Sequence, residues 1–353
     1  MRQLLTLFLI LNIAAATCFA AAPPAPPELP ADVKGKDGVK AYLLKVLDSC
    51  TQAAAEFKKL SAAYAQLINA HGGDYAAAAK ARPEDFGTLI RQMREAYQRL
   101  DSFGYEYVEG IVAGVPSLAK YDVELDSGNP AKGAAPDDPV ADVVVSAGDM
   151  KIDHEGALNN FLIEPAVYGT NPRFVAATIT LPGFEQPVAV PKAQVVVGLA
   201  DYAVDGYARL VKDSWAWQPT SQDCFEALVA MTPTLADYFE EWKESKKAGG
   251  SDGRFVAVSR VSDMRGIMGS VKLIWSGLEE EVAPRDKELA AAITKGYAQI
   301  MAFIDDVQAR ENKAPLNGEA IDFLGSQAKE KADQLTAQTA QAAALLKIDV
   351  GAK

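Results

Sequence analysis

One group of residues in this chain that could do chemistry is a pair of carboxylates set three positions apart with a tyrosine between them. Glu106 and Glu109 occupy positions i and i+3, which lie on one face of a helix, and Tyr107 stands beside them. Carboxylate oxygens are ligands for hard cations, so this pattern is a candidate site for a metal such as ferric iron. Pairs at this spacing are also common on solvated helices, and a plain surface role is the alternative.

The chain has only two histidines, His71 and His154. His71 precedes Gly72 and Gly73 at an expected helix end, where an imidazole interacts favourably with the helix dipole. His154 stands between Asp153 and Glu155, and it is a candidate metal ligand.

Known catalytic motifs are missing from the sequence. There is no HExxH metalloprotease motif and no G-x-S-x-G serine elbow, and neither glycine-rich phosphate loop occurs. We therefore expect no catalytic residue, although an enzymatic activity is left open.

Two apolar stripes predict the helices that position the first carboxylates. Apolar residues recur at steps of three, four or seven from Leu43 to Leu67 and again from Phe86 to Phe103, which predicts two amphipathic helices. Gly72 and Gly73 between them predict a short turn, so the two helices should form an antiparallel hairpin.

The middle of the chain is richer in turn-forming residues. Residues 125–139 have the Gly, Pro, Asp and Asn content of a loop, and a helix is expected around residues 154–168. Residues 175–181 and 188–190 flank a Pro-Gly pair and predict a minor β-hairpin. The helical period then returns at residue 193.

This pattern predicts an all-α protein of two helical bundles with a minor β-hairpin inserted between them. Roughly seven to nine helices are too many for one four-helix core. The expected organisation is a signal peptide (1–21), a Pro/Ala-rich linker (22–36), an N-terminal helical bundle (37–172), a connecting segment (173–192) and a C-terminal helical bundle (193–348).

The first residues predict export. Arg2 precedes an apolar run from Leu4 to Ala16, and small residues follow it, which is the layout of a secretory signal peptide. We therefore expect a periplasmic protein, and lipid attachment at Cys18 is the less favoured alternative. No later segment has about 20 uninterrupted apolar residues, so membrane insertion after cleavage is not expected.

The net charge bears on the possible binding partners, and the cysteine content bears on a possible disulfide. The net charge of −12 at pH 7 repels phosphate backbones, so a nucleic-acid partner is not expected. Cys50 and Cys224 follow the leader. Export permits a disulfide between them, whereas the position of Cys50 on an apolar helical stripe fits a buried thiol equally well.

Three segments of the chain resemble the imelysin family, which includes the M75-peptidase-like domain of periplasmic iron-uptake proteins. Residues 96–101 (AYQRLD) are similar to the family's helix segment of tyrosine, arginine and acid. Residues 161–168 (FLIEPAVY) are similar to its histidine-x-x-glutamate helix, and residues 261–307 with the last helix are similar to its closing bundle. The resemblance implies a two-bundle α-helical fold, a periplasmic or lipoprotein location and a role in iron acquisition.

The resemblance also implies a metal site. Glu164 and Asp101 occupy acidic positions of the family, but Phe161 stands where the family has histidine, and a phenyl ring cannot coordinate a metal. Either the site has lost its metal, or its ligands are rebuilt from oxygen donors such as Glu164 and Asp101. His154 is a further candidate that would enter the site from another turn. Pairing of Glu164 with a nearby basic residue is the alternative without a metal.

We therefore expect an exported protein for the acquisition of iron or a related metal. It would bind the metal ion itself, ferric or ferrous, or a metal-delivering partner in the cell envelope. A metal-free interaction module of the envelope and a metallopeptidase are the two alternatives, and the residues give the second no support.

Overall fold

The computed structural model describes residues 26–351. Over these residues the fold is mainly α-helical, with 65% helix, 12 α-helices and two small antiparallel sheets. In the described part of the chain, no helix has the length and apolar character needed to cross a membrane. The signal peptide expected over residues 1–21, with Cys18, lies outside the described residues.

The chain forms its elements in the following order. The first half contains α1 (Gly35–Asn69), α2 (Tyr75–Ala81), α3 (Pro83–Leu100), η1 (Tyr105–Tyr107), α4 (Glu109–Val112), α5 (Ala119–Asp122), η2 (Val123–Ser127), β1 (Val144–Ala147), β2 (Met150–Asp153), η3 (Leu158–Ile163), α6 (Glu164–Tyr168), β3 (Val175–Ile179) and β4 (Val188–Pro191). The second half contains α7 (Ala193–Ala216), α8 (Ser221–Met231), α9 (Leu235–Glu244), η4 (Lys246–Ala248), α10 (Arg260–Val282), α11 (Lys287–Glu311) and α12 (Gly318–Leu345).

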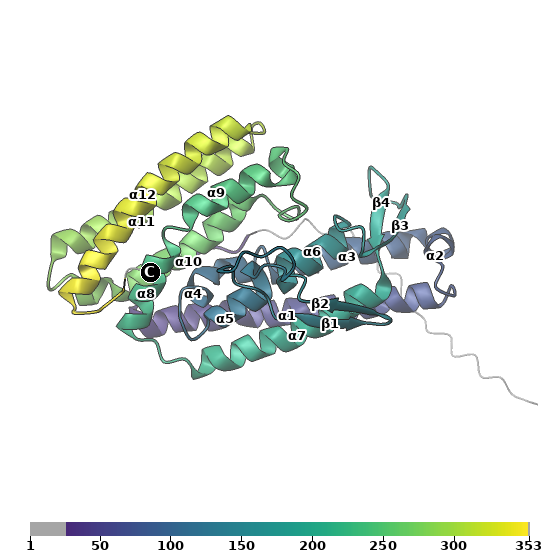
Figure 1. The fold of residues 1–353 in the computed structure, drawn as a ribbon, viewed down its shortest axis with the longest axis horizontal. Coiled ribbons are helices and arrows are strands. Elements are labelled where there is room, and N and C mark those ends of the chain that lie inside the picture. Colours follow the sequence, from purple (N-terminus) through teal and green to yellow (C-terminus); the bar gives the residue numbers. More distant parts are fainter. Residues whose placement is uncertain (1–25, 352–353) are drawn as a thin grey trace, which may run out of the picture.

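The first group of helices is built around α1, which packs against both α3 and α7 (Figure 1). The predicted stripe of α1 is buried, from Leu43 through Phe57 to Tyr64. Tyr64 meets Phe86 of α3 edge to face, with ring centroids 5.4 Å apart. The two predicted helices and the glycine turn between them are present, and the short helix α2 is added after the turn.

The second group contains α8 to α12. Helix α12 packs against α8, α9 and α11, while α10 packs against α8, α9 and α11 (Figure 1). Helix α10 also contacts α1, η1 and α4. The second group therefore meets the first mainly through α10, and α8 adds a contact with α4.

Two parts of the expected domain division differ from this packing. Helix α7 was assigned to the C-terminal bundle, but it lies along α1 and contacts β1 and η3. The described part of the linker lies against α10, where the Val33 backbone N–H donates to Ser276 Oγ at 2.8 Å. Lys272 Nζ donates to the Ala31 carbonyl in the same region at 2.6 Å.

The predicted β-hairpin is confirmed as β3 paired antiparallel with β4. A second hairpin, β1 with β2, was not predicted. It occupies the region just before the helix expected from residue 154, and that helix begins only at Leu158. His154 lies instead on a turn, with a positive φ of 52°.

The two cysteines are free and buried in the described structure, and they are not bonded to each other. Cys50 lies on the buried face of α1, and Cys224 lies on that of α8. Burial raises the pKa of Cys224 to about 12. The buried-thiol alternative therefore describes both residues.

Candidate metal centre

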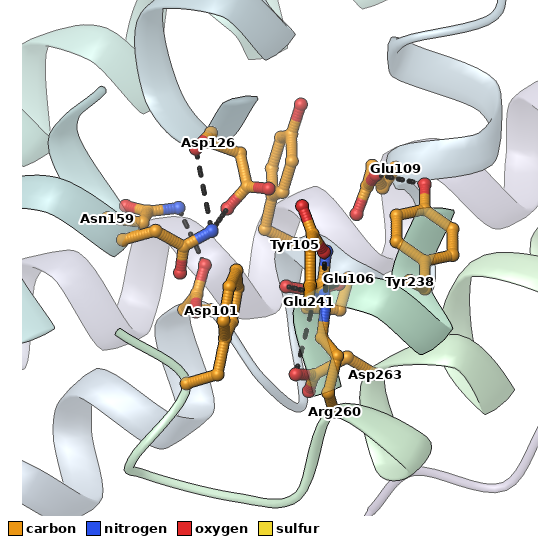
Figure 2. A network of polar contacts seen from close by, with 12 residues as sticks. Asp101, Tyr105, Glu106, Glu109, Asp126, Asn159, Tyr238, Glu241, Arg260 and Asp263 are labelled. Carbon is orange, nitrogen blue, oxygen red and sulfur yellow. Dashed lines mark hydrogen bonds and ion pairs between the residues drawn. The ribbon is translucent and has the colours of Figure 1, made fainter. Parts of the chain in front are cut away.

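The core contains an unusual excess of acidic side chains. Among the described residues, one guanidinium, that of Arg260, is buried together with seven carboxylates. Figure 2 shows Arg260 with Asp101, Glu106, Glu109, Asp126 and Asp263. Burying an unpaired charge is strongly unfavourable, so such a cluster needs protons or cations to balance it. The seven buried carboxylates belong to Asp101, Glu106, Glu109, Asp122, Asp126, Glu164 and Asp263.

Irregular backbone after α3 brings most of these groups into the core. Helix α3 ends at Leu100, and only short helical segments follow up to Ser127. Gly104 permits a close approach here, because a Cβ at this position would lie 2.9 Å from Cys50 Sγ and closer still to backbone carbonyls. At Gly110 a Cβ would lie 2.5 Å from Ser270 Oγ of α10. The chain therefore passes close to α1 at Gly104 and close to α10 at Gly110. These two contacts place η1 and α4 between the two helices.

Glu109, Asp122 and Asp126 form the first group of possible ligands, which we call the first triad. One carboxylate oxygen from each lies within 4.8 Å of the other two. All three residues line a cavity of about 270 Å³. The cavity opens to solvent where Ser127 and Asp237 are exposed at its rim.

Hydrogen bonds fix the carboxylates of the first triad but leave one oxygen free. Glu109 Oε1 accepts from Tyr238 Oη at 2.8 Å, whereas Glu109 Oε2 accepts no hydrogen bond from any described residue. Asp122 accepts from Tyr105 Oη at 2.9 Å. Asp126 Oδ1 accepts from Asn160 Nδ2 at 2.8 Å.

Asp101, Glu106 and Asp126 form a second triad that shares Asp126 with the first. Asp101 accepts from Tyr97 Oη at 2.7 Å and from Asn159 Nδ2 at 2.8 Å. Glu106 is paired with Arg260, whose Nη1 lies 3.1 and 3.2 Å from its two oxygens. The second triad is therefore more fully satisfied by protein groups than the first.

Burial raises the pKa values of the cluster. The pKa of Asp122 rises to about 6, mainly through desolvation. The pKa values of Asp101, Glu109 and Asp126 lie well above their usual range, with burial as the main cause and the charge of Glu106 as the next. Without a cation, the cluster should therefore retain protons near neutral pH.

Arg260 is the positive centre of the cluster. Its Nε donates to Glu241 at 2.8 Å, and its Nη1 donates to Glu106 and to Asp263. The guanidinium also lies over the rings of Tyr238 and Phe255, at 4.7 and 4.3 Å from their centroids.

Glu164 is buried but has a different role from the one predicted. Its carboxylate accepts hydrogen bonds from three consecutive backbone N–H groups, those of Phe255 at 2.6 Å and of Val256 and Ala257 at 2.8 Å each. Burial raises its pKa to about 7, although these donors oppose the rise. Glu164 therefore anchors the loop between α9 and α10, and it belongs to neither triad.

The structure places His154 outside both triads, on the turn after β2. Its side chain is 42% exposed, and Nδ1 lies 3.3 Å from an Asp142 oxygen. Phe161, which the predicted resemblance aligns with a histidine of the imelysin family, stacks on Arg254 with 4.5 Å from Cζ to the ring centroid. Neither residue contributes to the triads.

Of the predicted ligands, Asp101, Glu106 and Glu109 belong to the triads. The solvated-surface alternative for Glu106 and Glu109 is wrong, since both are buried. Asp122 and Asp126 were missed, although their spacing of four residues was a usable signal for a shared helix face. Asp126 falls at the start of the loop that the sequence predicted from residue 125, and Asp122 lies just before it.

No family model matches this chain, and no curated protein matches it. The resemblance to the imelysin family thus stays a prediction, and we infer a function from the buried acidic cluster.

Proposed function

We propose that the protein binds a metal cation in the first triad and serves the acquisition of iron or a related metal in the cell envelope. Glu109, Asp122 and Asp126 would be the protein ligands, and the ion would be cargo. One observation carries the proposal: Glu109 Oε2 is buried, with its residue only 4% exposed, and accepts from no described group. An oxygen of the same carboxylate lies within 4.8 Å of oxygens of Asp122 and Asp126, and all three residues line a cavity.

The spacing of the triad supports a cation between the three oxygens. Oxygens within 4.8 Å of one another leave a central point about 2.8 Å or less from each. Hard cations take oxygen ligands at about 2.0–2.6 Å, so a small inward movement of the side chains completes the coordination. Binding would also remove the repulsion between the carboxylates.

The donor set favours hard cations. All ligands in both triads are carboxylates, and no histidine or cysteine of the described chain joins them. Carboxylates suit magnesium, calcium and manganese, and they also suit ferric iron, whereas thiolates and thioethers select softer ions. Iron is the ion that the family resemblance implies.

We also propose a fold family and a cellular location for the protein. We propose an imelysin-like arrangement of two helical bundles in an exported protein, supported by the two helix groups that meet at α10. The cluster lies at this meeting point, since α10 supplies Arg260 and Asp263 and contacts η1 and α4.

The test is ion-induced stabilisation of the chelator-treated protein by ferric iron and manganese(II), compared with Glu109→Gln. We expect the wild type to gain about 2.7 kcal/mol at a hundred times the dissociation constant. Glu109→Gln should lose most of this gain and keep its helical content. The matched control is Glu330→Gln, which changes an exposed acid on α12.

Equal stabilisation of wild type and Glu109→Gln would remove Glu109 from the site. No stabilisation of the wild type by any ion would refute the proposed function.

A further inference from the structure

We infer that the cation binds together with a small carboxylate anion, which Arg254 and Arg260 hold in the cavity that the first triad also lines. This inference rests on the proposed cation site and names the chemical form of its cargo, a metal ion with a small polycarboxylate such as oxalate.

The cavity is too large for an ion alone. Its volume of about 270 Å³ far exceeds the ~30 Å³ that one water molecule takes in the liquid. A hard cation takes six or more oxygen ligands, and three carboxylates leave some of these positions open. Additional oxygen donors must therefore come from water or from a second molecule.

Two guanidinium groups line the cavity and retain unused donors. Arg260 is 3% exposed, and its Nη2 makes no hydrogen bond to any group that the structure describes, whereas Nε and Nη1 are engaged. Arg254 donates through Nε and Nη2 to Asp252, and its Nη1 likewise has no described acceptor. Neither nitrogen is a buried atom left without a partner, so both donors are open to an acceptor that enters the cavity.

Aromatic rings fix both guanidinium groups. Phe255 contacts both, with ring centroids 5.1 Å from Arg254 Cζ and 4.3 Å from Arg260 Cζ. Phe161 stacks on Arg254 from its own element, η3. Fixed guanidinium planes suit carboxylates, which they bind with parallel hydrogen bonds. The residue that replaces the family's histidine thus positions an arginine.

Electrostatics link the two ligands. An anion alone would face the buried carboxylates of the cluster and be repelled. A cation alone would leave the spare arginine donors and the remaining coordination positions of the ion to water. Each ligand should therefore raise the affinity for the other by the same factor, as equilibrium linkage requires.

The experiment is calorimetric titration of the chelator-treated protein with manganese(II), in oxalate or in sodium chloride of equal ionic strength. Affinities are compared at equal free manganese, because oxalate also binds the ion in solution. We expect oxalate to raise manganese affinity at least about fivefold, the lower end of typical coupling between ligands. Arg254→Gln should bind manganese alone and lose the oxalate effect.

The matched control is Arg173→Gln, which removes a partly exposed arginine paired with Glu155. It should retain the oxalate effect in full. Arg254→Lys keeps the charge but loses the planar guanidinium group, and it provides a second variant if Arg254→Gln does not fold. It should reduce the rise in manganese affinity caused by oxalate.

The outcomes separate the two proposals. Manganese binding with equal affinity in oxalate and chloride overturns the anion inference and leaves the cation site intact. An oxalate effect that survives both Arg254 variants also overturns it. Absence of manganese and ferric iron binding under every condition refutes the cation site.

Discussion

Glu109 shows how local hydrogen bonds prepare a carboxylate for an ion. Tyr238 donates to one oxygen and orients the group, and the other oxygen is buried without a described donor. Asp122 accepts from Tyr105 and Ser127, one to each oxygen, and Asp126 accepts from Asn160. Tyrosine and asparagine donors keep the acids in place without neutralising them, which leaves the charge for a cation.

The raised pKa values predict how stability of the ion-free protein depends on pH. In the folded state the pKa of Asp122 is about 6 and that of Glu164 about 7, against ordinary values of 3.8 and 4.5. Between the ordinary and the raised values the folded state binds more protons, so stability falls as pH rises. Their contribution is fully present below about pH 4 and is lost as pH passes through 6 to 7.

We therefore expect the chelator-treated protein to melt at a higher temperature at pH 5.5 than at pH 7.5, as measured by circular dichroism. A bound cation should reduce this difference, because it replaces the protons at the cluster and binds more tightly at higher pH. A melting temperature that rises with pH over this range in the ion-free protein would contradict the raised pKa values.

At the scale of elements, the loop between α9 and α10 forms part of the cavity wall. It carries Arg254 and Phe255, which line the cavity, and Phe255 has a positive φ of 54° that is unfavourable for a bulky residue. The three hydrogen bonds to Glu164 hold this strained backbone in place. The loop should therefore depend on Glu164 for its order.

Glu164→Gln should loosen this loop, since an amide has one acceptor oxygen in place of two. Hydrogen exchange at Phe255, Val256 and Ala257 should become at least about tenfold faster, equivalent to a loss of about 1.4 kcal/mol in local stability. Exchange in α12 should stay unchanged and serves as the internal control. Unchanged exchange at the three amides would show that Glu164 does not hold the loop.

The elements that the sequence predicts well are those with a regular period. The stripes of α1 and α3 and the Pro-Gly hairpin of β3 and β4 depend on local spacing, and these predictions are confirmed. The irregular segment from η1 to η2 has no such period, so Asp122 and Asp126 were missed. Glu164 was misassigned because its partners lie at residues 255–257, and local spacing carries no information about them.

At the scale of the whole molecule, the cluster joins the two groups of helices. The first group supplies the triads through the segment after α3, while the second supplies Arg260 and Asp263 on α10 and Tyr238 on α9. The two groups must therefore stay in register for Tyr238 to reach Glu109. A cation in the first triad would stabilise this arrangement.

The substitution Gly110→Ala tests whether stability and ion binding depend on the close contact between α4 and α10. The added Cβ would lie 2.5 Å from Ser270 Oγ and 3.0 Å from the Ile267 carbonyl, so α4 and α10 must move apart. We expect a loss of about 1–3 kcal/mol in unfolding free energy, as for other overpacked cores, and weaker ion binding. Gly318→Ala is the control, because its Cβ would meet only ordinary contacts at 3.5 Å or more. Equal urea midpoints for the two variants would show that the close contact between α4 and α10 at Gly110 does not limit stability.

The most direct measurement is the number of ions bound per chain by chelator-treated protein, titrated with ferric iron and manganese(II), for wild type and Asp126→Asn. Asp126 belongs to both triads, so its loss affects every candidate ligand set. We expect at least one tightly bound ion per wild-type chain and none in the variant. A wild-type chain that binds no ion, or a variant that binds as the wild type does, would contradict the cation site.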